Sequence, residues 1–310
     1  DFPREDRCNL ETWDPAVNAI TRAVDKTGAA TAVVASLPES LPEAVATNLM
    51  EKGIAPLCGI RQALDAAQAT AQIGVAWRRP VANMALPGPA SPLLESLESL
   101  DEWQAKCELA SGGVDVPHGE RVDSAEALKK AARSLTYPLV LKACDAKLTH
   151  KSDAGAVIID IGGIDDLAAA GQTLFARYPN LLVEEMVTDT VCELIVGVRQ
   201  DPVIGPWMMI GSGGIYAELL ADHKVVLLPV QNDDLEQLIN SLKISLLLKG
   251  YRGSEPGDMS ALLAGLQKLA RFSFEKRDTL MELEINPLLV RPKGKGVCAV
   301  DAVLQYARGS

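Results

Sequence analysis

The sequence lacks the features that mark secreted, membrane-spanning and nucleic-acid-binding proteins. No apolar run approaches the roughly 18 to 20 residues that cross a bilayer, and no basic segment followed by an apolar one opens the chain. The 30 Lys and Arg residues are dispersed and outnumbered by 41 Asp and Glu residues, giving a net charge of −11. This charge distribution argues against nucleic acid and against a membrane as partners. We expect a cytoplasmic protein.

Cysteine and histidine are also scarce. The six cysteines lie far apart with no C-x-x-C pair, so they indicate neither a zinc site nor a disulfide framework. The three histidines are His118, His150 and His223. Any chemistry that needs an imidazole therefore has few candidates.

At 310 residues the chain is longer than the roughly 100 to 200 residues of one domain, so we expect two. It begins with Asp1 rather than Met, which suggests a piece of a longer protein. Residues 1–79 alternate helical and strand patterns. Three helices are predicted: one at 15–26, one that starts with a capping box at Ser40–Glu43, and one at 60–76. Two buried strands are predicted at 31–37 and 54–58. This order is typical of part of a doubly wound parallel α/β sheet.

Residues 80–95 are rich in proline and predict a linker. Residues 96–310 then predict an α+β domain of two lobes, near 96–183 and 184–310, which can interleave. Helices are predicted at 99–110, 123–134, 165–177, 233–248 and 257–273. Strands are predicted at 139–143, 157–161, 181–185, 192–199 and 207–210, with a final hairpin of 281–285 and 297–303.

Several polar motifs follow these strands. Lys142 occupies the polar phase of an apolar strand, where a lysine suits nucleotide phosphates or is simply exposed. Glu184-Glu185-Met186-Val187 ends another strand and can offer backbone and carboxylate groups to adenosine, or be solvated. Gly211-Ser212-Gly213-Gly214 can form a nest of amides for phosphate or a plain tight turn, and it is not a P-loop.

Two further groups carry candidate chemistry. Glu282, Glu284 and Asn286 share one face of a strand that we expect Pro287 to end, and Asp301 lies on the partner strand. Their oxygens suit Mg²⁺, although taken alone these residues are better explained by a half-exposed polar sheet face. His150 stands in Thr149-His150-Lys151-Ser152-Asp153 and can be a base, a solvated residue or a phosphoryl acceptor.

Together and in this order, these motifs resemble the ATP-grasp module of ADP-forming (NDP-forming) acyl-CoA synthetases, relatives of succinyl-CoA synthetase. Residues 1–79 are similar to the tail of the flavodoxin-like CoA-ligase domain. The matching strings are Tyr137–Lys142, His150–Gly155, Val183–Val187, Asp201–Pro206, Gly211–Ile215, Gly250–Gly253 and Glu284–Leu288. Two departures from the family pattern are Gln200, where arginine is usual, and Ala156, where glycine is usual.

The resemblance implies a two-lobed clamp for ATP or ADP with Mg²⁺. It implies catalytic roles for His150, Lys151 and Asp153, with His150 as a phosphohistidine. Nucleotide binding is implied for Lys142, Glu184, Glu185, Met186, Val187, Glu193, Gly211, Gly213 and Gly214, and metal binding for Glu284, Asn286 and Asp301.

The same resemblance implies an acid–thiol ligase that is incomplete as this chain alone. CoA and the acid substrate would bind to a CoA-binding domain or α-type subunit, within a homo- or hetero-oligomer. Two alternatives stay open at this point. One is an ATP-grasp ligase that joins a carboxylate to an amine without CoA, and the other is a non-catalytic nucleotide-sensing module.

Overall fold

The structure is a computed structural model that describes residues 13–37, 40–78, 97–146, 148, 154–214 and 222–307. The chain divides into two units, Asp1–Asn83 and Met84–Ser310. The predicted linker lies outside the described residues, as do His150, Lys151 and Asp153. Every helix in the described part of the chain is too short or too polar to traverse a bilayer.

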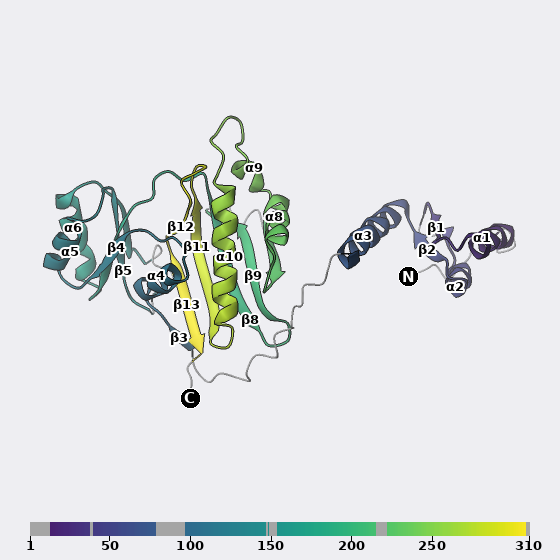
Figure 1. Ribbon diagram of the computed structural model, residues 1–310, viewed down its shortest axis with the longest axis horizontal. Coiled ribbons are helices and arrows are strands. Elements are labelled where there is room, and N and C mark those ends of the chain that lie inside the picture. The colour runs from purple at the N-terminus through teal and green to yellow at the C-terminus, as the bar shows by residue number, and fades with distance from the viewer. Residues whose placement is uncertain are drawn as a thin grey trace. The chain divides into compact units, whose positions relative to one another are not determined.

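The first unit alternates helices and strands as predicted (Figure 1). Its two strands pair in parallel, and its core includes the buried Leu41, Val45 and Leu49, which the pattern placed on one face. The predicted capping box does not form, because the second helix begins after Pro42 without a side-chain cap. The elements are α1 (Asp14–Thr27), β1 (Ala32–Ala35), α2 (Glu43–Glu51), β2 (Ala55–Cys58) and α3 (Ile60–Arg78).

The second unit contains two sheets, and the smaller one has the strand order β4-β7-β5-β6. Helices α5 and α6 cover one of its faces (Figure 1), and apolar residues from both layers form one core. We call this the small lobe. Its elements are β4 (Gly119–Val122), α5 (Ala125–Ala131), β5 (Leu139–Ala143), β6 (Val157–Ile161), α6 (Ile164–Phe175) and β7 (Leu181–Glu185).

The larger sheet has the strand order β10-β9-β8-β11-β13-β3, with β12 paired to β11. Helices α4, α8 and α10 share one core with it, and we call this the large lobe. Its strands are β3 (Leu97–Ser99), β8 (Cys192–Asp201), β9 (Gly205–Ser212), β10 (His223–Leu227), β11 (Leu280–Val290), β12 (Val297–Ala299) and β13 (Ala302–Ala307). Its helices are α4 (Glu102–Ser111), α8 (Asn232–Ser241), α9 (Ser245–Leu248) and α10 (Met259–Glu275).

Helix α4 precedes the small lobe in the chain but packs in the large lobe. Its Ala105 and Leu109 are fully buried in the large-lobe core, and β3 pairs with β13. Asp101 caps the helix by accepting from the amide of Gln104 at 2.9 Å. The two lobes therefore interleave along the sequence, and α4 lies between the sheets in Figure 1.

Strand β11 does not end at Pro287, as the sequence predicted, but continues to Val290. Its pairing with β8 shifts between Ile285 and Leu288, so the strand accommodates Asn286 and Pro287 in a bulge. A bulge re-aims side chains, and Asn286 is exposed there. Before the bulge, Leu283 and Ile285 face the core while Glu282 and Glu284 lie on the opposite face.

Candidate functional site

A pocket of about 310 Å³ lies between the two lobes. The small lobe provides apolar walls, including Val140 and Val157, and the large lobe provides Leu289. Most of the predicted binding residues gather here from separate elements, because the ends of β5 and β7 and the bulge of β11 meet at this cleft. They are Lys142, Glu184, Glu185, Met186, Val187, Glu193, Asn286 and Asp301.

A second hollow, of about 260 Å³, shares Asn286 and Asp301 with the first. Glu282 and Glu284 of β11 line it, and Asp301 is held near by a hydrogen bond of 3.2 Å from the amide of Asn286 to its backbone carbonyl. The three side chains predicted to bind metal, Glu284, Asn286 and Asp301, thus face one space. We call this the acidic hollow.

The donor chemistry of the acidic hollow suits a hard cation. Among the described residues, no group of three or more His, Cys, Asp and Glu side chains converges tightly enough to hold a metal ion alone. Mg²⁺ seldom requires such a cage, since it keeps several waters and binds one or two carboxylates together with substrate phosphates. Glu284, Asn286 and Asp301 supply oxygen ligands of this type beside the larger pocket.

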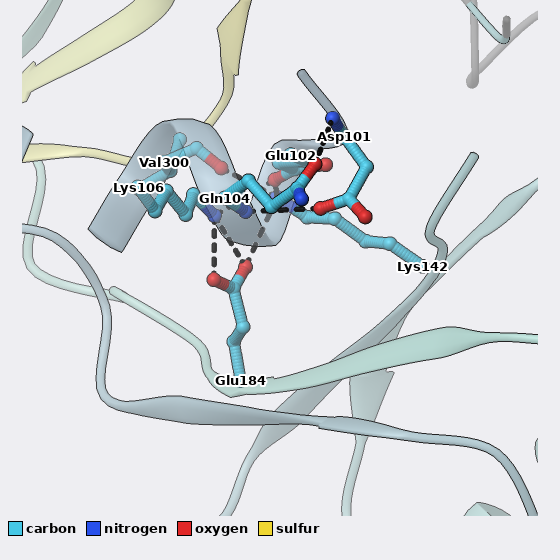
Figure 2. Close-up of polar contacts among 7 residues, drawn as sticks. All are labelled: Asp101, Glu102, Gln104, Lys106, Lys142, Glu184 and Val300. Carbon is cyan, nitrogen blue, oxygen red and sulfur yellow. Dashed lines mark hydrogen bonds and ion pairs between the residues drawn. The ribbon is translucent and has the colours of Figure 1, made fainter. Parts of the chain in front are cut away.

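Four buried charged side chains contact one another beside the pocket, which Lys142 and Glu184 also line. We call them the charged cluster: Glu102, Lys106, Lys142 and Glu184 (Figure 2). Lys106 lies 2.7 Å from Oε1 of Glu102 and 2.5 and 2.6 Å from the two oxygens of Glu184. Lys142 lies 2.7 Å from Oε1 of Glu102 and 3.1 Å from Oε2 of Glu184. Two ammonium groups and two carboxylates thus balance one another.

The two lysines differ in how firmly they hold their protons. Burial lowers the pKa of Lys106, and the nearby charge of Lys142 lowers it further, against the effect of the carboxylates. Burial also acts to lower the pKa of Lys142, but the carboxylates of Glu102, Glu184 and Asp301 outweigh it and raise that pKa above its ordinary value. Lys142 therefore remains a cation at the edge of the pocket.

The cluster changes the interpretation of Glu184. The sequence predicted that Glu184 binds adenosine, yet its side chain is 2% exposed and both oxygens are engaged by lysines. Figure 2 shows Glu184 pointing from its strand toward Lys106 on α4. In the structure this carboxylate contacts both lysines, and Glu184 also lines the pocket.

The residues after Glu184 remain at the pocket wall. The amides of Glu185 and Met186 donate to the carbonyls of His118 and Pro138, each at 2.9 Å. Oε1 of Glu185 accepts from the amide of Thr136 at 2.8 Å. These bonds fix an extended segment whose next residue, Val187, also lines the pocket.

The sequence left two conformations open for residues 211–214, a nest of amides and a tight turn, and in the structure two of these amides are already bonded. Gly211 and Ser212 continue β9, the amide of Ser212 donates to the carbonyl of Asp222, and that of Gly213 donates to the carbonyl of Glu193. A side chain at Gly213 would lie 3.0 Å from the backbone of Glu193, so glycine is needed for close packing. Gly214 adopts a positive φ of 77° beside the carboxylate of Glu193.

The sequence interpretation missed Glu102 and Lys106. A signal was present, because Glu102, Lys106 and the apolar Leu109 have the spacing of one helical face, which places a lysine on the side of the helix that faces the core. A buried lysine requires a carboxylate partner, but the sequence does not say that the partners come from another lobe.

Three comparisons with known proteins are consistent with this geometry. Residues 93–305 match the family described as the ATP-grasp domain. The β subunit of acetate–CoA ligase (ADP-forming) I from Pyrococcus furiosus is 30% identical over 211 residues, which are 66% of this chain and 90% of that subunit. The chain belongs to the ATP-grasp family of ADP-forming acyl-CoA synthetases.

Other members of the family are longer. The 4-hydroxybutyrate–CoA ligase (ADP-forming) of Nitrosopumilus maritimus is 32% identical over 216 residues, which are 67% of this chain and 31% of the ligase. A solved structure of the dinucleotide-forming acetyl-coenzyme A synthetase 1 of Ca. Korarchaeum cryptofilum contains coenzyme A and Mg-AMPPCP. It matches with a TM-score of 0.60 and 31% identity, over 68% of this chain and 93% of that chain. The chain thus spans about a third of the longer ligases it matches.

Proposed function

We propose that this chain is the nucleotide-binding part of an ADP-forming acyl-CoA synthetase, which converts an acid, CoA and ATP into acyl-CoA, ADP and phosphate. The observation that carries the proposal is the meeting of Lys142, Glu185, Val187, Asn286 and Asp301 around one inter-lobe pocket. A cation, an apolar slot and oxygen ligands then face the three parts of a Mg-nucleotide: phosphates, base and metal.

In this proposal Lys142 contacts the phosphates, and the segment from Glu185 to Val187 binds adenosine with Glu193 beside it. The apolar Val140, Val157 and Leu289 enclose the base. Glu284, Asn286 and Asp301 hold Mg²⁺, which when bound neutralises charge on the nucleotide phosphates. Gly213 and Gly214 pack against Glu193, and Gly211 packs against Asp222 and His223, so that the loop lies beside the nucleotide.

The proposal retains His150 as the phosphoryl acceptor, with Lys151 and Asp153 beside it. The support is the sequence motif, and in the Korarchaeum structure a phosphohistidine segment points towards the nucleotide-binding site. A neutral imidazole can accept a phosphoryl group, and a neighbouring lysine then helps to neutralise it.

The proposal also includes partners and domain roles. Residues 1–79 serve as a partial CoA-ligase-type unit, 80–95 as a linker and 96–310 as the nucleotide clamp. CoA and the acid bind to a CoA-binding domain or α-type subunit. The β subunits of the Pyrococcus enzymes support this division of labour.

The test combines the chain with its CoA-binding complement and a panel of small acids. We expect CoA-dependent release of ADP and an acid-labile phosphate on this chain, seen by intact-mass measurement. His150→Ala should abolish both signals and retain ATP binding, whereas His223→Ala, at an exposed position on β10, should change neither. ADP release that needs an amine instead of CoA indicates the carboxylate–amine ligase, and ATP binding without any phosphorylation indicates a sensor.

A further inference from the structure

The ammonium group of Lys142 is anchored in the large lobe, although its backbone belongs to the small lobe. Its strand β5 lies in the four-stranded sheet, yet its Nζ donates to Glu102 of α4 at 2.7 Å and to the backbone carbonyl of Val300. Val300 immediately precedes Asp301 of the acidic hollow. The position of the lysine tip is thus tied to the metal end of the pocket.

Within the charged cluster, each lysine has an acceptor for every one of its N–H donors. An ammonium group has three N–H donors. Those of Lys106 match Oε1 of Glu102 and both oxygens of Glu184, and those of Lys142 match Glu102, Glu184 and the carbonyl of Val300. The longest charged contact of Lys142 is the one to Glu184, at 3.1 Å. A phosphate can replace that contact while Glu102 and Val300 hold the lysine in place.

Lys106 makes this exchange possible by compensating the charge of Glu184. Lys106 is 1% exposed and contacts both oxygens of Glu184 at short distance. Without its positive charge, Glu102 and Glu184 would share Lys142 alone, and the buried cluster would carry an excess negative charge. That charge would draw Lys142 away from an anionic ligand and repel the ligand as well.

We propose that Glu102 and Lys106 of α4 are positioning residues for nucleotide binding: they hold Lys142 against the large lobe and occupy Glu184, so that Lys142 can meet phosphate. This inference rests on the proposed function, because it assigns the pocket to a nucleotide. It adds a pair of side chains that touch no ligand and act only through Lys142.

The test is isothermal titration of the full chain with Mg-ATP and, as a phosphate-free probe, with adenosine. Lys106→Met keeps the length of the side chain and removes its charge. We expect ATP to bind about tenfold more weakly to this variant, with adenosine binding changed much less. Glu102→Gln should weaken ATP binding as well, because Lys142 then loses the carboxylate that anchors it in the large lobe.

Lys276→Met is the matched control, because Lys276 also pairs with α4, through Glu108 at 2.6 Å, but lies outside the pocket. It should leave the affinity for ATP unchanged. A wild-type chain that binds no ATP contradicts the proposed function itself. A wild-type chain that binds ATP overturns this inference if Lys106→Met or Glu102→Gln binds ATP as tightly as wild type does, or if Lys106→Met loses ATP and adenosine alike.

A structure of the wild-type chain with Mg-ATP provides a second measurement that needs no variant. We expect Lys142 to contact phosphate, to keep its contact with Glu102 and to exchange its contact with Glu184. A Lys142 that leaves Glu102 on binding overturns the inference.

Discussion

Replacing Lys142 by methionine separates its contribution to stability from its contribution to ligand binding. The substitution keeps most of the side-chain volume and removes an ammonium group that contacts Glu102 at 2.7 Å, Glu184 at 3.1 Å and the carbonyl of Val300. Glu102 and Glu184 are then left, 1% and 2% exposed at their side chains, with Lys106 as their shared cation. Removing one partner of a buried ion pair costs about 3–5 kcal/mol, and we expect a loss of this size in the free energy of unfolding.

The double variant Lys142→Met/Glu102→Gln returns the cluster to neutrality. Lys106 and Glu184 remain as a pair at 2.5 Å, so we expect the double variant to recover at least about 2 kcal/mol of the free energy of unfolding. ATP binding should be lost in both variants, because neither has the ammonium group that contacts phosphate. Urea unfolding followed by circular dichroism measures the first quantity, and calorimetric titration measures the second.

Two results would refute this reasoning. A single variant that loses less than about 1 kcal/mol would show that the cluster is not a set of mutually dependent buried charges. A double variant no more stable than the single one would show that packing or hydrogen-bond geometry, and not charge balance, governs the site.

Three further predictions concern the metal end and the large lobe. Asn286→Ala and Asp301→Asn should each weaken binding of Mg-ATP more than binding of Mg-free nucleotide, as calorimetry with and without EDTA would show. Asp258→Asn should lower the free energy of unfolding by about 2 kcal/mol in urea titrations, because its carboxylate accepts from Ser260, Ala261, Gly294 and Gly296. Burial acts to raise the pKa of Asp258, but these donors outweigh it and lower the pKa below the ordinary 3.8. The stabilisation by this carboxylate is therefore complete above pH 3.8 and is lost as the pH falls through the lowered pKa. The asparagine variant should lack this acid dependence. Burial raises the pKa of Cys192 to about 12 and that of Cys298 to about 11, so a maleimide at neutral pH should label neither until urea is added.

Much of the fold follows from local patterns in the sequence. The strands β5, β6 and β7 have the bounds that the apolar runs predicted. A strand that is buried in a sheet consists mainly of apolar residues, so its extent can be recognised in the sequence. β3, β4 and β10 were not predicted. β3 and β4 are short, and His223–Leu227 of β10 carries mostly exposed side chains. These three strands form by pairing with neighbouring strands, and burial of apolar side chains does not mark them in the sequence.

The residues of the candidate site were also predicted from local patterns. Such patterns do not report contacts between residues that lie far apart in the sequence. Lys142 and Glu185 line the pocket from positions at or next to the ends of their strands, and Asn286 lines it from the bulge in β11. The bulge that carries Asn286 and Pro287 depends on pairing with β8, and the amides of Ser212 and Gly213 are occupied by neighbouring carbonyls. Such contacts join residues far apart in the chain, so no local pattern reports them.

The sequence by itself determined the family motifs, the elements that carry them and the set of charged and amide side chains at their ends. Only the tertiary structure decided that Glu184 pairs with Lys106, and that Glu102 of α4 supplies a counter-charge of Lys142. The physical reason is that a buried charge is stable only with a partner nearby in space. In this protein those partners lie in the other lobe, 40 and 78 residues away along the chain.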